Sequence, residues 1–257
     1  MKHSLLLVSL SLLACGPAPT PQPVKPTQLT LATTGTLSVE LLTFAPLTVG
    51  QNRVFYRVKN EGAEVPHAEM VQHPVMQMET MKHACPLQNP DHMPNADGLY
   101  EGLIVFTMAS SEMDVWSLTL DVALSHDGLS QRVDFGAIAV GDSTMKKVVT
   151  RDGKKIVLSL GYPQAPHVGS NPVVVTAHQA TDMTMMDFSA VGDLTFTLTS
   201  EMPSMGHGAS GNVSPVRGDD GLYRGTAIFS MAGDWVVHLG VSAGETALDQ
   251  FDFAVDL

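Results

Sequence analysis

The clearest β-strand pattern in this 257-residue chain is Trp116-Ser117-Leu118-Thr119-Leu120-Asp121-Val122, and a second copy is Trp235-Val236-Val237-His238-Leu239-Gly240-Val241. In both, every second residue is apolar, which is typical of a strand with one buried face. Clusters of Gly, Asn and Asp interrupt such segments, as at 60–62, 95–98 and 219–221, and these residue types favour turns. No long 3.6-residue period follows the N-terminal segment, so the chain is predicted to be all-β.

The same motifs occur twice, in the same order and 118–124 residues apart. The pairs include Val49-Gly50-Gln51-Asn52 with Val168-Gly169-Ser170-Asn171, Met78-Glu79-Thr80-Met81-Lys82-His83 with Met202-Pro203-Ser204-Met205-Gly206-His207, and Gly98-Leu99-Tyr100 with Gly221-Leu222-Tyr223. About 100 residues with roughly seven short strands is typical of an immunoglobulin-like sandwich. We therefore predict two tandem immunoglobulin-like β-sandwiches at 36–140 and 154–257, joined by a connector at 141–153 that has room for a short strand.

The N-terminus has the features of an export signal. Lys2 precedes a short apolar stretch, and Leu12-Leu13-Ala14-Cys15 resembles a bacterial lipobox. That resemblance implies a signal peptide at 1–14 and lipidation of Cys15, and two or more acyl chains anchor a protein stably to a membrane. Residues 15–35 are Pro-rich at their start and are expected to form an extended linker. Gly16 after the cysteine favours the outer membrane in a Gram-negative cell.

The remaining composition limits the kinds of partner. With 26 Asp and Glu against 14 Lys and Arg, the net charge is −12, which argues against nucleic acid as a partner.

Cys85 has no intramolecular partner once Cys15 carries lipid. In an oxidising compartment such a thiol is expected to be buried, coordinated to a metal, or paired with another molecule.

Residues 67–93 are unusually rich in soft metal donors. This stretch of 27 residues holds four His and five Met, out of 10 His and 15 Met in the chain. Thioether and thiolate are soft ligands and imidazole is borderline, a combination that selects Cu(I). The candidate ligands are Met76, Met78, Met81, His83 and Cys85 in the first unit and Met202, Met205 and His207 in the second. The first unit, with more donors, is expected to dominate. The alternative is that these methionines fill a hydrophobic core.

Several of these motifs together resemble the YtkA-like domain, which is related to FixH-like proteins. The first unit resembles it through Met76-x-Met78-x-x-Met81-x-His83 and Gly98-Leu99-Tyr100-x-Gly102, and the second through Met202-x-x-Met205-Gly206-His207 and Met231-Ala232-Gly233-Asp234-Trp235. The resemblance implies a small extracytoplasmic β-sandwich, often associated with copper handling.

Two functions remain as hypotheses, and neither is enzymatic, because motifs such as Gly-x-Ser-x-Gly, the P-loop and His-Glu-x-x-His are absent. The first is a cell-envelope lipoprotein that binds copper and exchanges it with a copper-donor or copper-acceptor protein. The second is a structural or protein-interaction lipoprotein that binds no metal.

Overall fold

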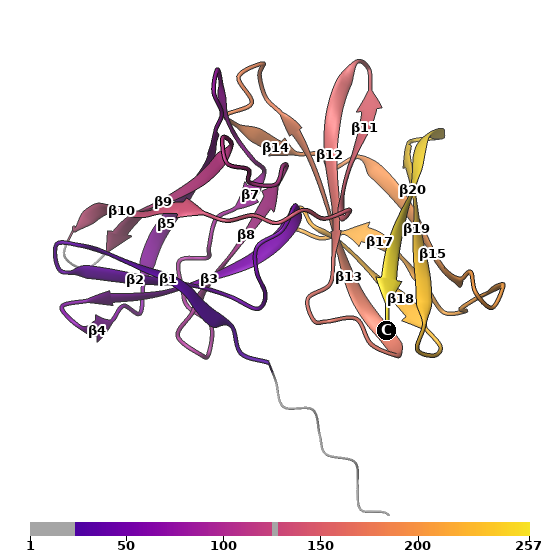
Figure 1. Ribbon diagram of the computed structural model, residues 1–257, viewed down its shortest axis with the longest axis horizontal. Coiled ribbons are helices and arrows are strands. Elements are labelled where there is room, and N and C mark those ends of the chain that lie inside the picture. The colour runs from indigo at the N-terminus through magenta and orange to yellow at the C-terminus, as the bar shows by residue number, and fades with distance from the viewer. Residues whose placement is uncertain (1–23, 125–127) are drawn as a thin grey trace, which may run out of the picture.

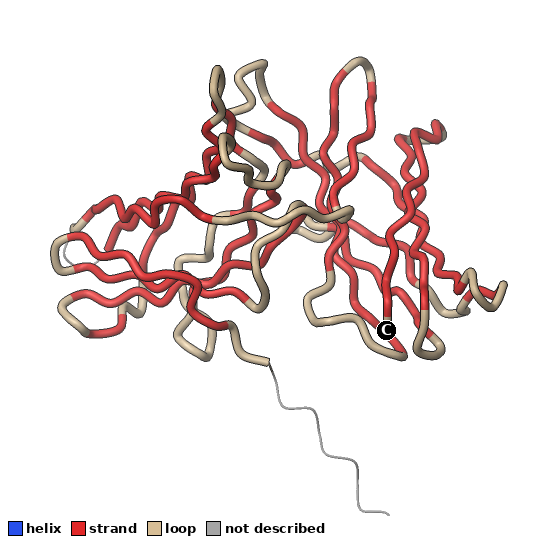
Figure 2. The backbone as a smooth tube through the Cα atoms, viewed as in Figure 1, coloured by secondary structure: helices blue, strands red, loops and turns tan. Residues whose placement is uncertain are grey.

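The computed structural model describes residues 24–124 and 128–257, and within them the chain folds into two β-sandwiches without any helix (Figures 1 and 2). This confirms the prediction of an all-β chain with two tandem sandwiches. The predicted signal peptide at 1–14 and the lipidation site Cys15 lie outside the described residues. The described part of the chain contains no helix that could span a membrane.

The first sandwich packs a six-stranded antiparallel sheet against a four-stranded one. The larger sheet has the order β1-β2-β3-β8-β7, with β4 paired to β3, and the smaller sheet has the order β10-β9-β5-β6. The strands are β1 Thr27–Thr34, β2 Leu37–Thr43, β3 Gly50–Asn60, β4 Ala63–Glu64, β5 Ala68–Gln77, β6 Lys82–Ala84, β7 Leu87–Gln88, β8 Tyr100–Phe106, β9 Val115–Leu124 and β10 Ser130–Ile138.

The second sandwich repeats this topology strand for strand. Its sheets have the orders β11-β12-β13-β18-β17, with β14 paired to β13, and β16-β15-β19-β20. The strands are β11 Lys146–Arg151, β12 Lys154–Gly161, β13 Gly169–Ala180, β14 Phe188–Ala190, β15 Leu194–Met202, β16 His207–Gly208, β17 Val213–Arg217, β18 Tyr223–Phe229, β19 Asp234–Ala243 and β20 Thr246–Asp256. The internal repeat of the sequence is therefore a repeat of structure.

The two tryptophans occupy equivalent places at the centre of each core. Trp116 on β9 and Trp235 on β19 are 0% and 1% exposed, and the apolar residues that alternate with polar ones along the same strands are also buried. Each indole N–H donates a hydrogen bond of 2.9 Å to a backbone carbonyl, that of Met108 or of Met231. Both rings are thus buried without leaving an indole N–H unpaired, at the second residue of β9 and of β19.

The repeated Val-Gly-x-Asn motif builds the same turn twice. Asn52 accepts a hydrogen bond from the backbone of Thr48 and donates to the carbonyls of Thr48 and Gly50. Asn171 makes the equivalent three bonds, including one to the carbonyl of Gly169. Both glycines have positive φ, 101° and 111°, which disfavours residues with a Cβ atom. The repeated motif therefore forms the turn that leads into β3 in the first sandwich and into β13 in the second.

The sandwich boundaries differ from those expected. Strand β1 lies inside the segment 15–35 that was predicted to be a linker, and β11 lies inside the predicted connector 141–153. Each is an edge strand that pairs on one side only, with β2 or β12. Because an edge strand buries little apolar surface, β1 leaves Leu29 and Leu31 44% and 51% exposed and shows only a weak alternating pattern.

The two sandwiches contact each other through β3 and the β12–β13 pair. The backbone N–H of Gln51 donates to Ser159 Oγ (2.8 Å), and its side-chain amide donates to the carbonyl of Val174 (2.6 Å). The guanidinium of Arg53 donates to the carbonyl of Pro163 (2.9 Å). These specific bonds across the interface couple the stability of one sandwich to that of the other.

Candidate metal-binding site

The β5–β6 hairpin brings four of the candidate donors together. Met76 lies directly opposite His83 in the antiparallel register, and the backbone N–H of Met78 donates to the carbonyl of Met81 (2.9 Å) to close the turn. Opposed residues in an antiparallel pair project to the same face. Met76 is in the hydrophobic core of the first sandwich and Met78 packs against that core, which places these two methionines on the inner face.

His83 has a defined tautomer at this site. Its Nδ1 lies 2.7 Å from the carbonyl oxygen of Ala84. Because a carbonyl only accepts hydrogen bonds, Nδ1 of the neutral ring carries the hydrogen and Nε2 keeps its lone pair. This is a common way of orienting a metal-ligating histidine. The ring also meets Trp116 edge-on, with centroids 5.5 Å apart and an interplanar angle of 86°, which fixes its orientation further.

Exposure rises steadily along the hairpin from the core to its tip. Met76 is 0% exposed, Met78 is half-buried and Met81 is 44% exposed, while His83 is 6% exposed. The donors therefore extend from the tryptophan outward to solvent. Among the described residues, no group of three or more His, Cys, Asp and Glu side chains is placed to hold a metal ion. The donors that the hairpin offers are thioethers and one imidazole.

Cys85, the fifth candidate of the first unit, has a different environment. It is 2% exposed and belongs to the hydrophobic core. Burial raises the pKa of its thiol well above the ordinary value. Because the thiolate is the form that binds metals, this environment disfavours Cys85 as a ligand. Of the three alternatives that the sequence left open, the geometry favours a buried structural thiol.

The second sandwich contains a reduced version of the hairpin. Met202 lies opposite His207, whose ring meets Trp235 at a centroid distance of 5.9 Å. The hydrogen bond that orients the imidazole is weaker, because Nδ1 lies 3.4 Å from the carbonyl of Gly208. Met202 is buried, whereas Met205 is 61% exposed at the tip. The second site therefore has one inward thioether and one imidazole.

The register corrects the alignment of the two motifs. The sequence repeat matches Met202 with Met78, since both stand five residues before the histidine. In the structure Met202 is the cross-strand partner of its histidine, which is the place of Met76 in the first sandwich. The second hairpin has a turn two residues shorter, so it has no counterpart of the pair formed by half-buried Met78 and exposed Met81.

A methionine-rich loop of the second sandwich reaches the first hairpin, a contact that sequence reasoning missed. The carbonyl of Met185 accepts a hydrogen bond from the backbone N–H of Ala84 on β6 (2.9 Å). Met186 and Cys85 line a common cavity of about 260 Å³, and Met183 in the same loop is 95% exposed. The run Met183-Thr184-Met185-Met186 was the only available signal, and nothing in it indicates a contact between sandwiches.

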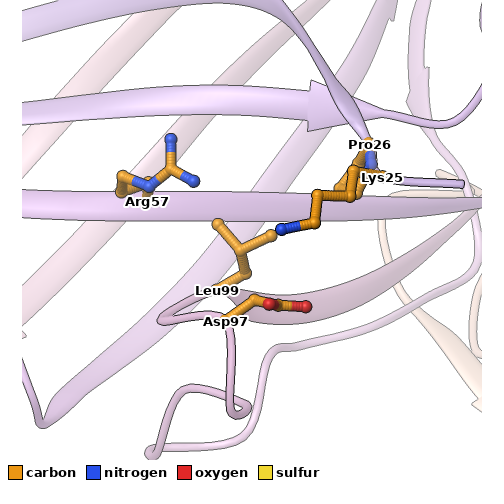
Figure 3. Close-up of a pocket in the computed structure, with 5 residues that line it drawn as sticks. All are labelled: Lys25, Pro26, Arg57, Asp97 and Leu99. Carbon is orange, nitrogen blue, oxygen red and sulfur yellow. The ribbon is translucent and has the colours of Figure 1, made fainter. Parts of the chain in front are cut away.

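A second, smaller pocket lies away from these donors. Figure 3 shows its lining, formed by Lys25, Pro26, Arg57, Asp97 and Leu99. Its volume is about 90 Å³. Arg57 is already paired with Glu40, at 2.6 Å. No soft donor lines this pocket, so it does not belong to the candidate metal site.

A comparison with protein families gives a match over part of the chain. Residues 150–240 match the family described as YtkA-like. Domains 5–6 of the S-layer protein SbsC align with 90% of this chain and 99% of their own length, at 10% identity and a TM-score of 0.31. The D0–D1 domain of intimin aligns with 84% of this chain and 96% of its own, at 13% identity and a TM-score of 0.24. No curated protein matches the chain.

Proposed function

We propose that this chain, in which residues 150–240 are a YtkA-like domain, is an exported lipoprotein that binds Cu(I) in its first sandwich and catalyses no reaction. The observation that carries the proposal is the cross-strand pair of Met76 and His83, whose Nδ1 lies 2.7 Å from the carbonyl oxygen of Ala84. Its partner would be a protein that donates copper to the site or accepts it.

The chemistry of the hairpin supports a monovalent soft cation. Met76, Met78 and Met81 offer neutral thioethers and His83 a neutral imidazole, and this ligand set matches the preference of Cu(I). Since no ligand carries a negative charge, a divalent ion would be more costly to hold in this half-buried place than a monovalent one. A position between the core and solvent also suits metal that must be passed on.

The anchor completes the proposal. Cys15 would carry the lipid, and 11 residues separate it from the start of β1 at Thr27. In an extended polyproline conformation this segment would span roughly 35 Å, enough to hold the first sandwich clear of lipid headgroups. The protein would thus act at the cell envelope, on the outer membrane in a Gram-negative cell.

The second candidate function is a structural or protein-interaction lipoprotein without metal. The observation in its favour is the complete burial of Met76, which fills the core beside Trp116 as an ordinary apolar side chain would. Under this alternative the methionines contribute only packing and the loops at the ends of the sandwiches contact a partner.

One experiment tests anchor and metal separately. The full chain is expressed in a bacterial host with copper-supplemented medium, and its lysate is divided by detergent phase separation. We expect protein and copper together in the detergent phase. Cys15→Ser should leave the protein unprocessed or move it to the aqueous phase, whereas joint replacement of the three domain-1 methionines by leucine should keep the protein in detergent but without copper. Wild-type protein in the aqueous phase would refute the anchor, and copper-free wild-type protein would refute the metal site.

A further inference from the structure

We propose a second, independent metal site formed by His67 and His92, which binds a divalent cation and prefers Cu²⁺. The two residues are 25 positions apart in the sequence and come from different connections of the first sandwich. His67 precedes β5, and His92 lies in the loop between β7 and β8. The backbone N–H of Ala68 donates to the carbonyl of His92 (3.1 Å), which ties the two segments together.

The spacing of the two imidazole rings fits a shared metal ion. Their centroids lie 4.9 Å apart and the ring planes make an angle of 44°. With metal–nitrogen bonds of about 2.0 Å, each ring centre lies about 3.1 Å from the metal, so ligand angles of 90–109° place the two centres about 4.4–5.1 Å apart. The observed spacing lies within that range.

Asp91 orients one of the rings for ligation. Its Oδ1 lies 2.8 Å from Nδ1 of His92 and also accepts the backbone N–H of that residue (2.7 Å). Because a carboxylate only accepts, Nδ1 carries the hydrogen, and in the neutral ring Nε2 is then the nitrogen that can bind a metal. A carboxylate behind a histidine fixes its tautomer and increases its basicity as a metal ligand.

The surroundings favour a divalent ion of borderline softness. The side chains of His92 and Asp91 are 56% and 79% exposed, so water can complete the coordination of a bound ion. Two imidazoles with water ligands suit first-row divalent metals, among which Cu²⁺ binds most tightly. The adjacent carboxylate of Asp91 reduces the electrostatic cost of holding a doubly charged cation. The methionine hairpin offers no such negative charge among its candidate ligands.

The two sites are far enough apart to act independently. His67 stands at the start of β5 and Met76 near its end, nine residues later. At a rise of about 3.3 Å per residue, the distance along the strand is about 30 Å. The histidine site therefore neither requires the proposed Cu(I) site nor shares a ligand with it.

This proposal is tested by titrating the full mature chain, without a polyhistidine tag, with Cu²⁺. Binding is followed by calorimetry and by electron paramagnetic resonance. We expect one nitrogen-coordinated Cu²⁺ per chain. His67→Ala and His92→Ala should each lower its affinity at least tenfold, and Asp91→Asn should lower it less. His73→Ala is the matched control: this half-buried histidine on β5 also contacts an aspartate, Asp121, at 2.9 Å.

The outcomes separate this site from the Cu(I) site. Replacement of the hairpin methionines by leucine should leave the Cu²⁺ affinity unchanged. Unchanged Cu²⁺ affinity in His67→Ala would overturn the proposal, as would an equal loss in His73→Ala. Because the side chains concerned lie on the surface, the melting temperature of each variant should match that of the wild type and so report on an intact fold.

Discussion

Joint replacement of Met76, Met78 and Met81 by leucine should abolish the rise in melting temperature that Cu(I) produces in the wild-type protein. Met→Leu roughly conserves volume and usually costs less than about 1.5 kcal/mol in a core, but it removes the thioether. A ligand at 100 times its dissociation constant stabilises the fold that binds it by about 2.7 kcal/mol. For a chain of this size we expect the wild type to melt roughly 5–10 °C higher with Cu(I).

The measurement is thermal unfolding followed by circular dichroism, with and without Cu(I), under anaerobic reducing conditions. Met70→Leu is the matched control, because Met70 is a buried inward residue of the same strand and stands outside the hairpin. This variant should keep the full Cu(I) shift. If the triple variant keeps it too, the hairpin methionines only pack, and the interaction-lipoprotein hypothesis replaces the copper proposal.

His178 is expected to make the protein less stable as the pH falls from about 6.5 to about 4. Burial lowers the pKa of this histidine from 6.5 to about 4. Its Nδ1 has no hydrogen-bond partner within the described residues. Below pH 6.5 the unfolded chain binds a proton that the folded chain does not, so folding loses stability until the folded form is also protonated near pH 4. The total loss is about 3 kcal/mol.

Urea denaturation between pH 7 and pH 4 measures this loss. His178→Gln cannot titrate, so its free energy of unfolding should vary less over this range by about 3 kcal/mol. Asp121→Asn serves as a control, because Arg132 and His73 hold the pKa of that carboxyl at about 2, and its protonation affects stability only at lower pH. An unchanged pH profile in His178→Gln would show that the ring is hydrated in solution.

The fold could be predicted from the sequence wherever a strand has one buried and one exposed face. Trp116 and Trp235 lie near the start of such strands, and their alternating neighbours identified the two cores. Strands β1 and β11 could not be found in this way, because edge strands bury little apolar surface and leave a weak pattern. Their pairing with β2 and β12 depends on contacts between segments rather than on local periodicity.

The candidate site was predictable in composition but not in register. The spacing of Met76 and Met78, and of Met81 and His83, indicated shared faces, and the hairpin places them on one face. The length of each turn determines which residue lies opposite the histidine. Alignment of the two sequence motifs therefore paired Met202 with Met78, whereas in the structure it is equivalent to Met76. The burial of Cys85 also depends on tertiary packing that a single segment cannot reveal.

Competition for Cu(I) against a chromophoric chelator measures the affinity of the proposed hairpin site itself. The full chain should remove one tightly bound equivalent from the chelator under anaerobic conditions. Met202→Leu with Met205→Leu should leave that equivalent in place, whereas the three leucines in the first hairpin should weaken it by more than about 100-fold, beyond what loss of a supporting contact causes. Equal Cu(I) affinity in the wild type and in the first-hairpin variant would show that Met76, Met78 and Met81 do not bind the metal.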